Sequence, residues 1–194
     1  MLIKPSTESA NPNKADLPYW PKSSLSLALS ALLVLIPHPQ DSCPMTESSI
    51  LIRRSYAQLF AQAALSNAEK ETDDIRPIKH VDAAGVAPSC SSLHAHVPSQ
   101  LDPILSLVVL AIYEYCQRGN VSRMRARVNQ AVTTAMDISL HNLGTPTTEY
   151  SEAQRRAWWM TVSIRSEKIV AANPVLRCLC LINPRIFILR YGSS

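Results

Sequence analysis

The sequence predicts an all-α fold, an irregular bundle of about five helices that includes one antiparallel helical hairpin. Apolar residues recur at intervals of three and four along most of the chain, which is the period of an amphipathic helix rather than of a strand. Fourteen prolines stand against four glycines, and most of the prolines separate the periodic segments from one another. The chain has 194 residues, 46% of them apolar and 18% charged, which is sufficient for one domain with a substantial core.

The first periodic segment follows an irregular lead-in, residues 1–24, that contains several prolines and no sustained period. Residues 24–36 read SLSLALSALLVLI, and as a helix they would span about 20 Å, short of the roughly 30 Å hydrocarbon core of a bilayer. We therefore expect a buried core helix that ends at Pro37. The alternative is a non-catalytic helical protein anchored to, or exported across, a membrane by residues 24–36. The expected core stripe consists of Leu25, Ala28, Leu29, Leu32, Leu33 and Ile36.

A second helix is predicted after the proline-rich break at residues 37–44. The charged run NAEKETDD, residues 67–74, is expected to end its apolar stripe in solvent. Residues 76–100 hold three prolines and one glycine and predict a long loop. The expected stripe of this second helix consists of Ile52, Tyr56, Leu59, Phe60 and Ala63.

The third and fourth helices are predicted to form the hairpin. Asp102 is expected to be the N-cap of the third helix, with Pro103 at its first position. Gly119 can take the left-handed conformation that ends a helix, and Asn120 can cap the helix that follows, over residues 121–139. The expected inner faces are Leu105, Val108, Val109, Ile112 and Cys116 on the third helix, and Met124, Val128, Ala131, Val132 and Ala135 on the fourth.

The fifth predicted helix contains two adjacent tryptophans. Ser151 and Gln154 have the S-x-x-Q spacing of a capping box, so the helix should begin with SEAQRRAWWMT. Neighbouring side chains on a helix lie about 100° apart, so the two indoles cannot share one contact. We expect Trp158 to have a structural role in the core. Trp159, together with Arg155 and Arg156, is the candidate interaction surface. These side chains could either form a cation–π contact on the surface that has no binding role, or form a docking face.

No catalytic, cofactor-binding or metal-binding residue is predicted. The sequence has no G-x-S-x-G, no glycine-rich phosphate loop and no H-E-x-x-H, so an enzyme is not expected. Cys90, His94 and His96 could converge on an ion, but they lack a spaced fourth ligand. The net charge is +4, yet the arginines of SRMRARVNQ do not form one continuous stripe, so direct binding of DNA is not expected either.

The succession of segments resembles one known family. LSLVVLAIYEYCQRGNVSRMRARVNQAVTTAMDISLHNLG, a break, and then SEAQRRAWWMTVSI are similar to the fungal-specific transcription factor domain, the middle regulatory region of binuclear zinc-cluster transcription factors. The shared features are a leucine-rich helix, a glycine-containing turn, a helix ending in ISLH at residues 138–141, and a helix with paired Arg and paired Trp. The resemblance covers about residues 25–173, and residues 174–194 form a divergent tail.

The resemblance implies a nuclear regulator of RNA polymerase II transcription that works through protein partners of the transcription machinery, a homodimer or a small-molecule effector. In the family, DNA is read by a six-cysteine module that holds two zinc ions, and the five scattered cysteines here do not supply it. Zinc is therefore expected only in that missing module. The chain is expected to be a partial domain from a truncated gene model, prone to self-association, with one indole partly exposed to water.

Overall fold

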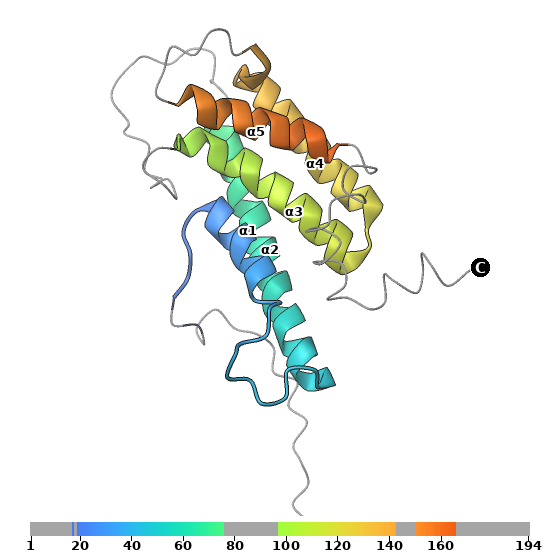
Figure 1. Ribbon diagram of the computed structural model, residues 1–194. Helices are drawn as coiled ribbons and strands as arrows, with labels where there is room; N and C mark the ends of the chain where they lie inside the picture. The colour runs from blue at the N-terminus through green and yellow to red at the C-terminus, as the bar shows by residue number, and fades with distance from the viewer. Residues whose placement is uncertain (1–16, 18, 76–96, 143–149, 166–194) are drawn as a thin grey trace, which may run out of the picture.

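The computed structural model describes residues 17, 19–75, 97–142 and 150–165, and in these residues it is all-α (Figure 1). This confirms the predicted fold class, with five α-helices and two short 3-10 helices in the described part of the chain. Residues 76–96 of the predicted loop 76–100, the predicted tail 174–194, and the residues Cys90, His94 and His96 lie outside the described residues. The elements are α1 (Ser24–Leu33), α2 (Glu47–Ile75), η2 (Ser99–Leu101), α3 (Asp102–Arg118), α4 (Val121–Asp137), η3 (Leu140–Asn142) and α5 (Ser151–Ile164).

Helix α3 is the centre of the bundle. It packs against α1 and α2 on one side and against α4 and α5 on the other, as Figure 1 shows. The apolar stripe predicted for α3 contained too few residues, because a helix with four neighbouring helices buries side chains on all of its faces. Leu105 and Ile112 from that stripe are only half-buried, whereas Leu107 is fully buried. Other buried α3 residues that the stripe omitted are Ile104, Leu110, Ala111, Tyr113 and Tyr115.

Helix α1 is a core helix, as predicted. Leu27, Ala28 and Ala31 are completely buried in contact with α2 and α3. The helix ends at Leu33 rather than at Pro37, because the chain continues as tighter turns in which the Ile36 amide donates to the Leu33 carbonyl at 3.0 Å. The predicted stripe was therefore wrong at its end, where Leu33 and Ile36 are exposed.

The apolar run at residues 24–36 was the one sequence candidate for a membrane segment. In the described part of the chain, no helix combines the length and the apolar character needed to span a bilayer.

Helix α2 continues through the charged run to Ile75, so the prediction that this run ends the stripe was wrong. Small side chains at spacings of three and four let α2 lie close to its neighbours, while the charged residues occupy its other faces. Ile52, which was predicted to be in the stripe, is exposed instead. The core-facing row consists of Ala57, Phe60, Ala61, Ala64, Ala68 and Thr72.

One of the charged residues of α2 caps α1. The Ser24 amide donates to Glu71 Oε1 at 3.1 Å, and the Ser24 hydroxyl donates to Oε2 of the same carboxylate. The Ser106 hydroxyl of α3 donates to the Ser24 carbonyl at 3.2 Å. A carboxylate at a helix N-terminus satisfies free amides and complements the helix dipole. These bonds therefore join α1, α2 and α3 at one point.

The hairpin of α3 and α4 has the predicted turn. Gly119 is left-handed, with φ 63° and ψ 17°, and its amide donates to the Tyr115 carbonyl at 3.2 Å. Asn120 is the N-cap of α4, because its side-chain oxygen accepts from the Arg123 amide at 2.9 Å. The Glu114 carboxylate lies 3.6 Å from Arg118 Nε and 3.8 Å from Arg123 Nη1, so charges from both helices meet at the turn.

We expect Asn120→Ala to reduce the free energy of unfolding by about 1 kcal/mol, because alanine cannot accept the Arg123 amide hydrogen. Asn120→Asp keeps an acceptor at the N-cap and should stay close to wild type. Urea denaturation followed by circular dichroism would measure both variants. Equal stability of the alanine and aspartate variants would show that this cap contributes nothing.

Two other predicted caps are wrong. Asp102 has helical angles, φ −56° and ψ −49°, because the 3-10 turn η2 runs directly into α3 and Leu101 takes the N-cap position. Ser151 is the first residue of α5, and Tyr150 precedes it as N-cap. The Gln154 amide donates to the Tyr150 carbonyl at 3.0 Å, so Ser151 and Gln154 do not form the predicted capping box.

Helix α4 ends at Asp137, two residues earlier than predicted, where Ser139 takes a left-handed conformation with φ 60°. Its inner face includes Thr134, which is 2% exposed, in addition to the predicted Met124, Val128, Ala131 and Ala135. The predicted Val132 is only half-buried. The face of α4 that meets the other helices is therefore partly polar.

Candidate protein-docking surface

Helix α5 lies on α3 and α4 through a narrow face of small residues. Ala157 and Thr161 are buried, and the Thr161 hydroxyl donates to the Ala157 carbonyl at 2.7 Å. Because these two residues are one helical turn apart, they fix which side of α5 faces the core. The remaining side chains of α5 are half-buried or exposed.

The two adjacent tryptophans have different surroundings, as predicted. Trp158 is half-buried against the core cluster that holds Leu107 and Ala157. Its ring centre lies 6.0 Å from that of His141, at an interplanar angle of 52°. Trp159 is 61% exposed. This arrangement agrees with a structural role for Trp158 and leaves Trp159 available to a partner.

The two predicted arginines are held by one carboxylate. Arg155 Nε donates to Glu152 Oε2 at 2.9 Å, and Arg156 Nε donates to Glu152 Oε1 at 2.7 Å. Arg155 Nη2 also donates to Glu152 Oε2. Both guanidinium groups stay exposed to solvent. Glu152 therefore restricts both arginine side chains without burying their charge, and the cluster keeps a net charge of +1.

Glu152 was missed in the sequence, although its signal was present there. It lies three residues before Arg155 and four before Arg156, and side chains at these spacings are neighbours on a helix. We call the group formed by Glu152, Arg155, Arg156, Trp159 and the exposed Met160 the α5 surface. It offers an indole, a thioether and two guanidinium groups, which are side-chain groups that often contribute to protein interfaces.

The hydrogen bond from Arg156, followed in size of effect by the one from Arg155, lowers the pKa of Glu152 below its usual value of 4.5. A carboxyl group with a lowered folded-state pKa stabilises the fold above its unfolded pKa, and this contribution is lost as the pH falls through the folded pKa. We expect Arg156→Ala to raise the pKa of Glu152 back toward 4.5. Carbon-13 NMR titration of the Glu152 carboxyl would measure it, and an unchanged midpoint in the variant would contradict this ion-pair geometry.

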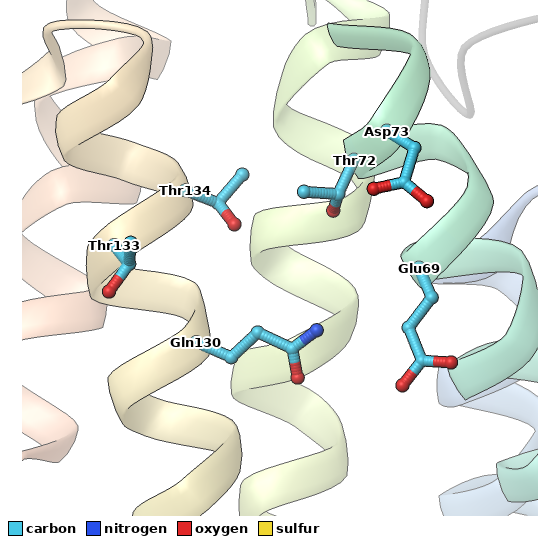
Figure 2. A pocket seen from close by; sticks show the side chains of 6 residues that line it. All are labelled: Glu69, Thr72, Asp73, Gln130, Thr133 and Thr134. Atoms are coloured by element: carbon cyan, nitrogen blue, oxygen red, sulfur yellow. The ribbon is translucent and has the colours of Figure 1, made fainter. Parts of the chain in front are cut away.

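A polar groove between α2 and α4 is the second candidate site, and the sequence did not indicate it. The groove has a volume of about 480 Å³, and Figure 2 shows side chains from both helices around it, with α3 behind. Two of the lining residues, Glu69 and Asp73, have an i, i+4 spacing that could be read from the sequence. The lining residues are Glu69, Thr72, Asp73, Gln130, Thr133 and Thr134.

Metal ligation was not predicted for this chain. The described segments hold no group of three or more His, Cys, Asp or Glu side chains placed to bind an ion. Cys43 is exposed and Cys116 is buried, and neither forms a disulfide bond.

The fold and these two sites define a helical-bundle protein with an exposed arginine–tryptophan surface on one helix and a polar groove between two others. Comparison with known proteins adds no relative: no family model, no curated protein and no solved structure matches the chain.

Proposed function

We propose that the chain is the regulatory domain of a fungal transcription factor and that it controls RNA polymerase II transcription in the nucleus through protein contacts. The similarity to the fungal-specific transcription factor domain supports this proposal. The segments that carry this similarity include α3, the Gly119 turn, α4 and α5, which pack against one another in the fold. In this proposal DNA is contacted only through a zinc-cluster module outside this chain.

The observation that carries the proposal is the exposure of Trp159 beside two positioned arginines. An indole that is 61% exposed leaves a large apolar area in water, and a partner protein that covers it gains the free energy of that burial. Tryptophan and arginine are also among the residues that are enriched at energetically dominant interface positions. Because Glu152 already holds Arg155 and Arg156, less side-chain entropy is lost when a partner binds.

The charge distribution favours a protein partner over direct DNA contact. Arg155 and Arg156 share the negative charge of Glu152. Arg127 Nη1 donates to Gln130 Oε1 at 3.3 Å and lies 4.0 Å from Glu69 Oε1, so its charge is directed into the groove. A mixed surface of this kind suits an acidic or amphipathic protein segment of the transcription machinery better than a row of phosphates.

A reporter assay tests the proposal. The full chain is fused to a heterologous DNA-binding domain in yeast, and transcription from a reporter bearing its site is measured. We expect the fusion to change reporter transcription, and Trp159→Ala to remove most of that change. Tyr19→Ala is the control, because Tyr19 is also an exposed aromatic residue (71%) and lies before α1 rather than on α5.

Circular dichroism melts must show that both variants fold like wild type. A fusion that leaves reporter transcription unchanged would contradict the regulatory function. A loss of effect in Tyr19→Ala that equals the loss in Trp159→Ala would contradict the assignment to the α5 surface.

A further inference from the structure

The first turns of α2 project beyond the other helices, beside the connection that comes from α1 (Figure 1). No residue of α2 from Glu47 to Tyr56 is buried, whereas the rest of the helix has a row of buried side chains. The projecting part is nevertheless apolar, since residues 50–52 read ILI. Leu51 is 53% exposed and Ile52 is 48% exposed. Apolar side chains gathered on an exposed element are a common mark of an interaction surface.

One side of the projecting part alternates small and large side chains. Its positions follow one another at spacings of four, three and four residues, which places them along one side of a helix. The Ser55 hydroxyl donates to the Leu51 carbonyl at 2.9 Å, so its donor stays satisfied when the serine is covered. All of these residues are exposed or half-buried. We call the group formed by Ser48, Leu51, Ile52, Ser55 and Leu59 the α2 face.

We propose that the α2 face is the interface of a homodimer in which the α2 helices of two copies pack antiparallel about a twofold axis. Pairing centred between residues 53 and 54 places Ile52 opposite Ser55 of the partner subunit, and Leu59 opposite Ser48 of the partner subunit. Each large side chain then meets a small one, so the two helices can approach closely. Parallel pairing would instead place large opposite large and small opposite small.

This order of side chains is the reason for choosing a second copy as the partner. A twofold interface uses the same surface on both subunits, so that surface must be complementary to itself. The α2 face meets this condition in the antiparallel orientation, because the sequence small, large, small, large is matched by its own reverse. The dimer lies on a different helix from the α5 surface, and it does not depend on the proposed function.

The charges around the α2 face allow a second copy to approach. The face itself carries no charged side chain. Arg53 is directed away from it, because its guanidinium donates to the Pro44 carbonyl at 2.6 Å and lies 3.3 Å from Asp41 Oδ2. Glu47 and Arg54 lie about 100–120° around the helix from the middle of the face. The net charge of +4 on each copy therefore does not place like charges in the interface.

The size of the α2 face predicts a weak dimer. Residues 48–59 span about 18 Å of helix. Two helices in contact over this length form an interface at the low end of specific complexes, below roughly 1,200 Å² in total. We expect a dissociation constant on the order of 100 µM. At a few micromolar the chain is then mostly monomeric, so unfolding measured at that concentration reports on the single copy.

Sedimentation equilibrium of the full chain, from about 5 to about 500 µM, tests the proposal. We expect the weight-average mass to rise with concentration from 21.4 kDa toward twice that value. Ile52→Asp should weaken the association about tenfold or more, because it places an unpaired charge at two positions of the interface. The matched control is Met136→Asp, which puts the same charge at an equally exposed apolar position of α4 (49%) and should change the dissociation constant less than about twofold.

A mixture of two variants tests the orientation. Ile52→Asp and Ser55→Lys chains should each associate more weakly than wild type when alone. When they are mixed, antiparallel pairing brings the new carboxylate opposite the new ammonium group, so association should recover. In a parallel pair these two charges would not face each other. Circular dichroism must show that all variants keep the wild-type helix content.

The proposal fails if the mass stays at that of one chain up to about 500 µM, or if Met136→Asp weakens association as much as Ile52→Asp does. Mixed variants that do not recover would contradict the antiparallel pairing. Flotation of the chain with phosphatidylcholine and phosphatidylserine vesicles, lost in Ile52→Asp, would assign the α2 face to a lipid surface instead. A lower melting temperature of Ile52→Asp at a few micromolar would show that another segment of the same chain covers the face.

Discussion

Replacing Val108 with Asp is expected to leave most of the chain unfolded at 25 °C. Val108 has no exposed surface and belongs to the core cluster to which α2, α3, α4 and α5 all contribute. Aspartate has a volume close to that of valine, so the damage comes from burying a charge without a partner, which costs several kcal/mol. The valine side chain also contributes about 1.5–3 kcal/mol by its burial. Together these losses approach the whole stability of a typical domain, about 5–15 kcal/mol.

The control for this variant is Ile52→Asp, which places the same charge on an exposed β-branched position of α2. We expect a change within about 0.5 kcal/mol, as for other surface substitutions. Far-ultraviolet circular dichroism and urea titration of both variants would measure the difference. A cooperative wild-type transition in Val108→Asp would mean that α3 is not the centre of the fold.

The helices were predictable because their signals are local, whereas the depth of burial was not. The period of apolar residues fixed where α3 and α4 lie, and the local chemistry of Gly119 and Asn120 fixed the turn between them. A prediction from an apolar stripe assumes that a helix has one buried face. It could therefore not reveal that α3 packs against α1, α2, α4 and α5. Leu107 was omitted for that reason although it is completely buried.

The errors on α2 and at two helix starts have a common physical cause. A charged run was expected to mark solvent, yet Ala68 and Thr72 inside it supply a narrow face that packs while the charges remain outside. At α3, the 3-10 turn η2 shifts the N-cap from Asp102 to Leu101. In both places the neighbouring structure overrode a signal that was correct for an isolated segment.

The two candidate sites differ in the same way. The α5 surface lies on a single helix, so Trp159 and its two arginines could be assigned to one region from helical spacing alone. The groove requires α2 and α4, which are brought together by α3 although 45 residues separate Ile75 from Val121 in the numbering. No spacing rule relates Asp73 to Thr134, so the sequence could not indicate that site.

Replacing Phe60 with Ala is expected to reduce the free energy of unfolding by about 3–5 kcal/mol, because it removes a large buried ring from the core. Phe60 is stacked on Trp20, with ring centres 5.2 Å apart and an interplanar angle of 23°. Trp20 belongs to the predicted irregular lead-in, so this pair anchors residues before α1 onto the core.

In a background with Trp158→Phe and Trp159→Phe, Trp20 is the remaining tryptophan, and its emission should shift to longer wavelength in Phe60→Ala as the ring becomes exposed to water. Phe60→Leu, which keeps most of the buried area, should lose less stability. Unchanged melting and unchanged Trp20 emission in Phe60→Ala would show that the lead-in is not held by this contact.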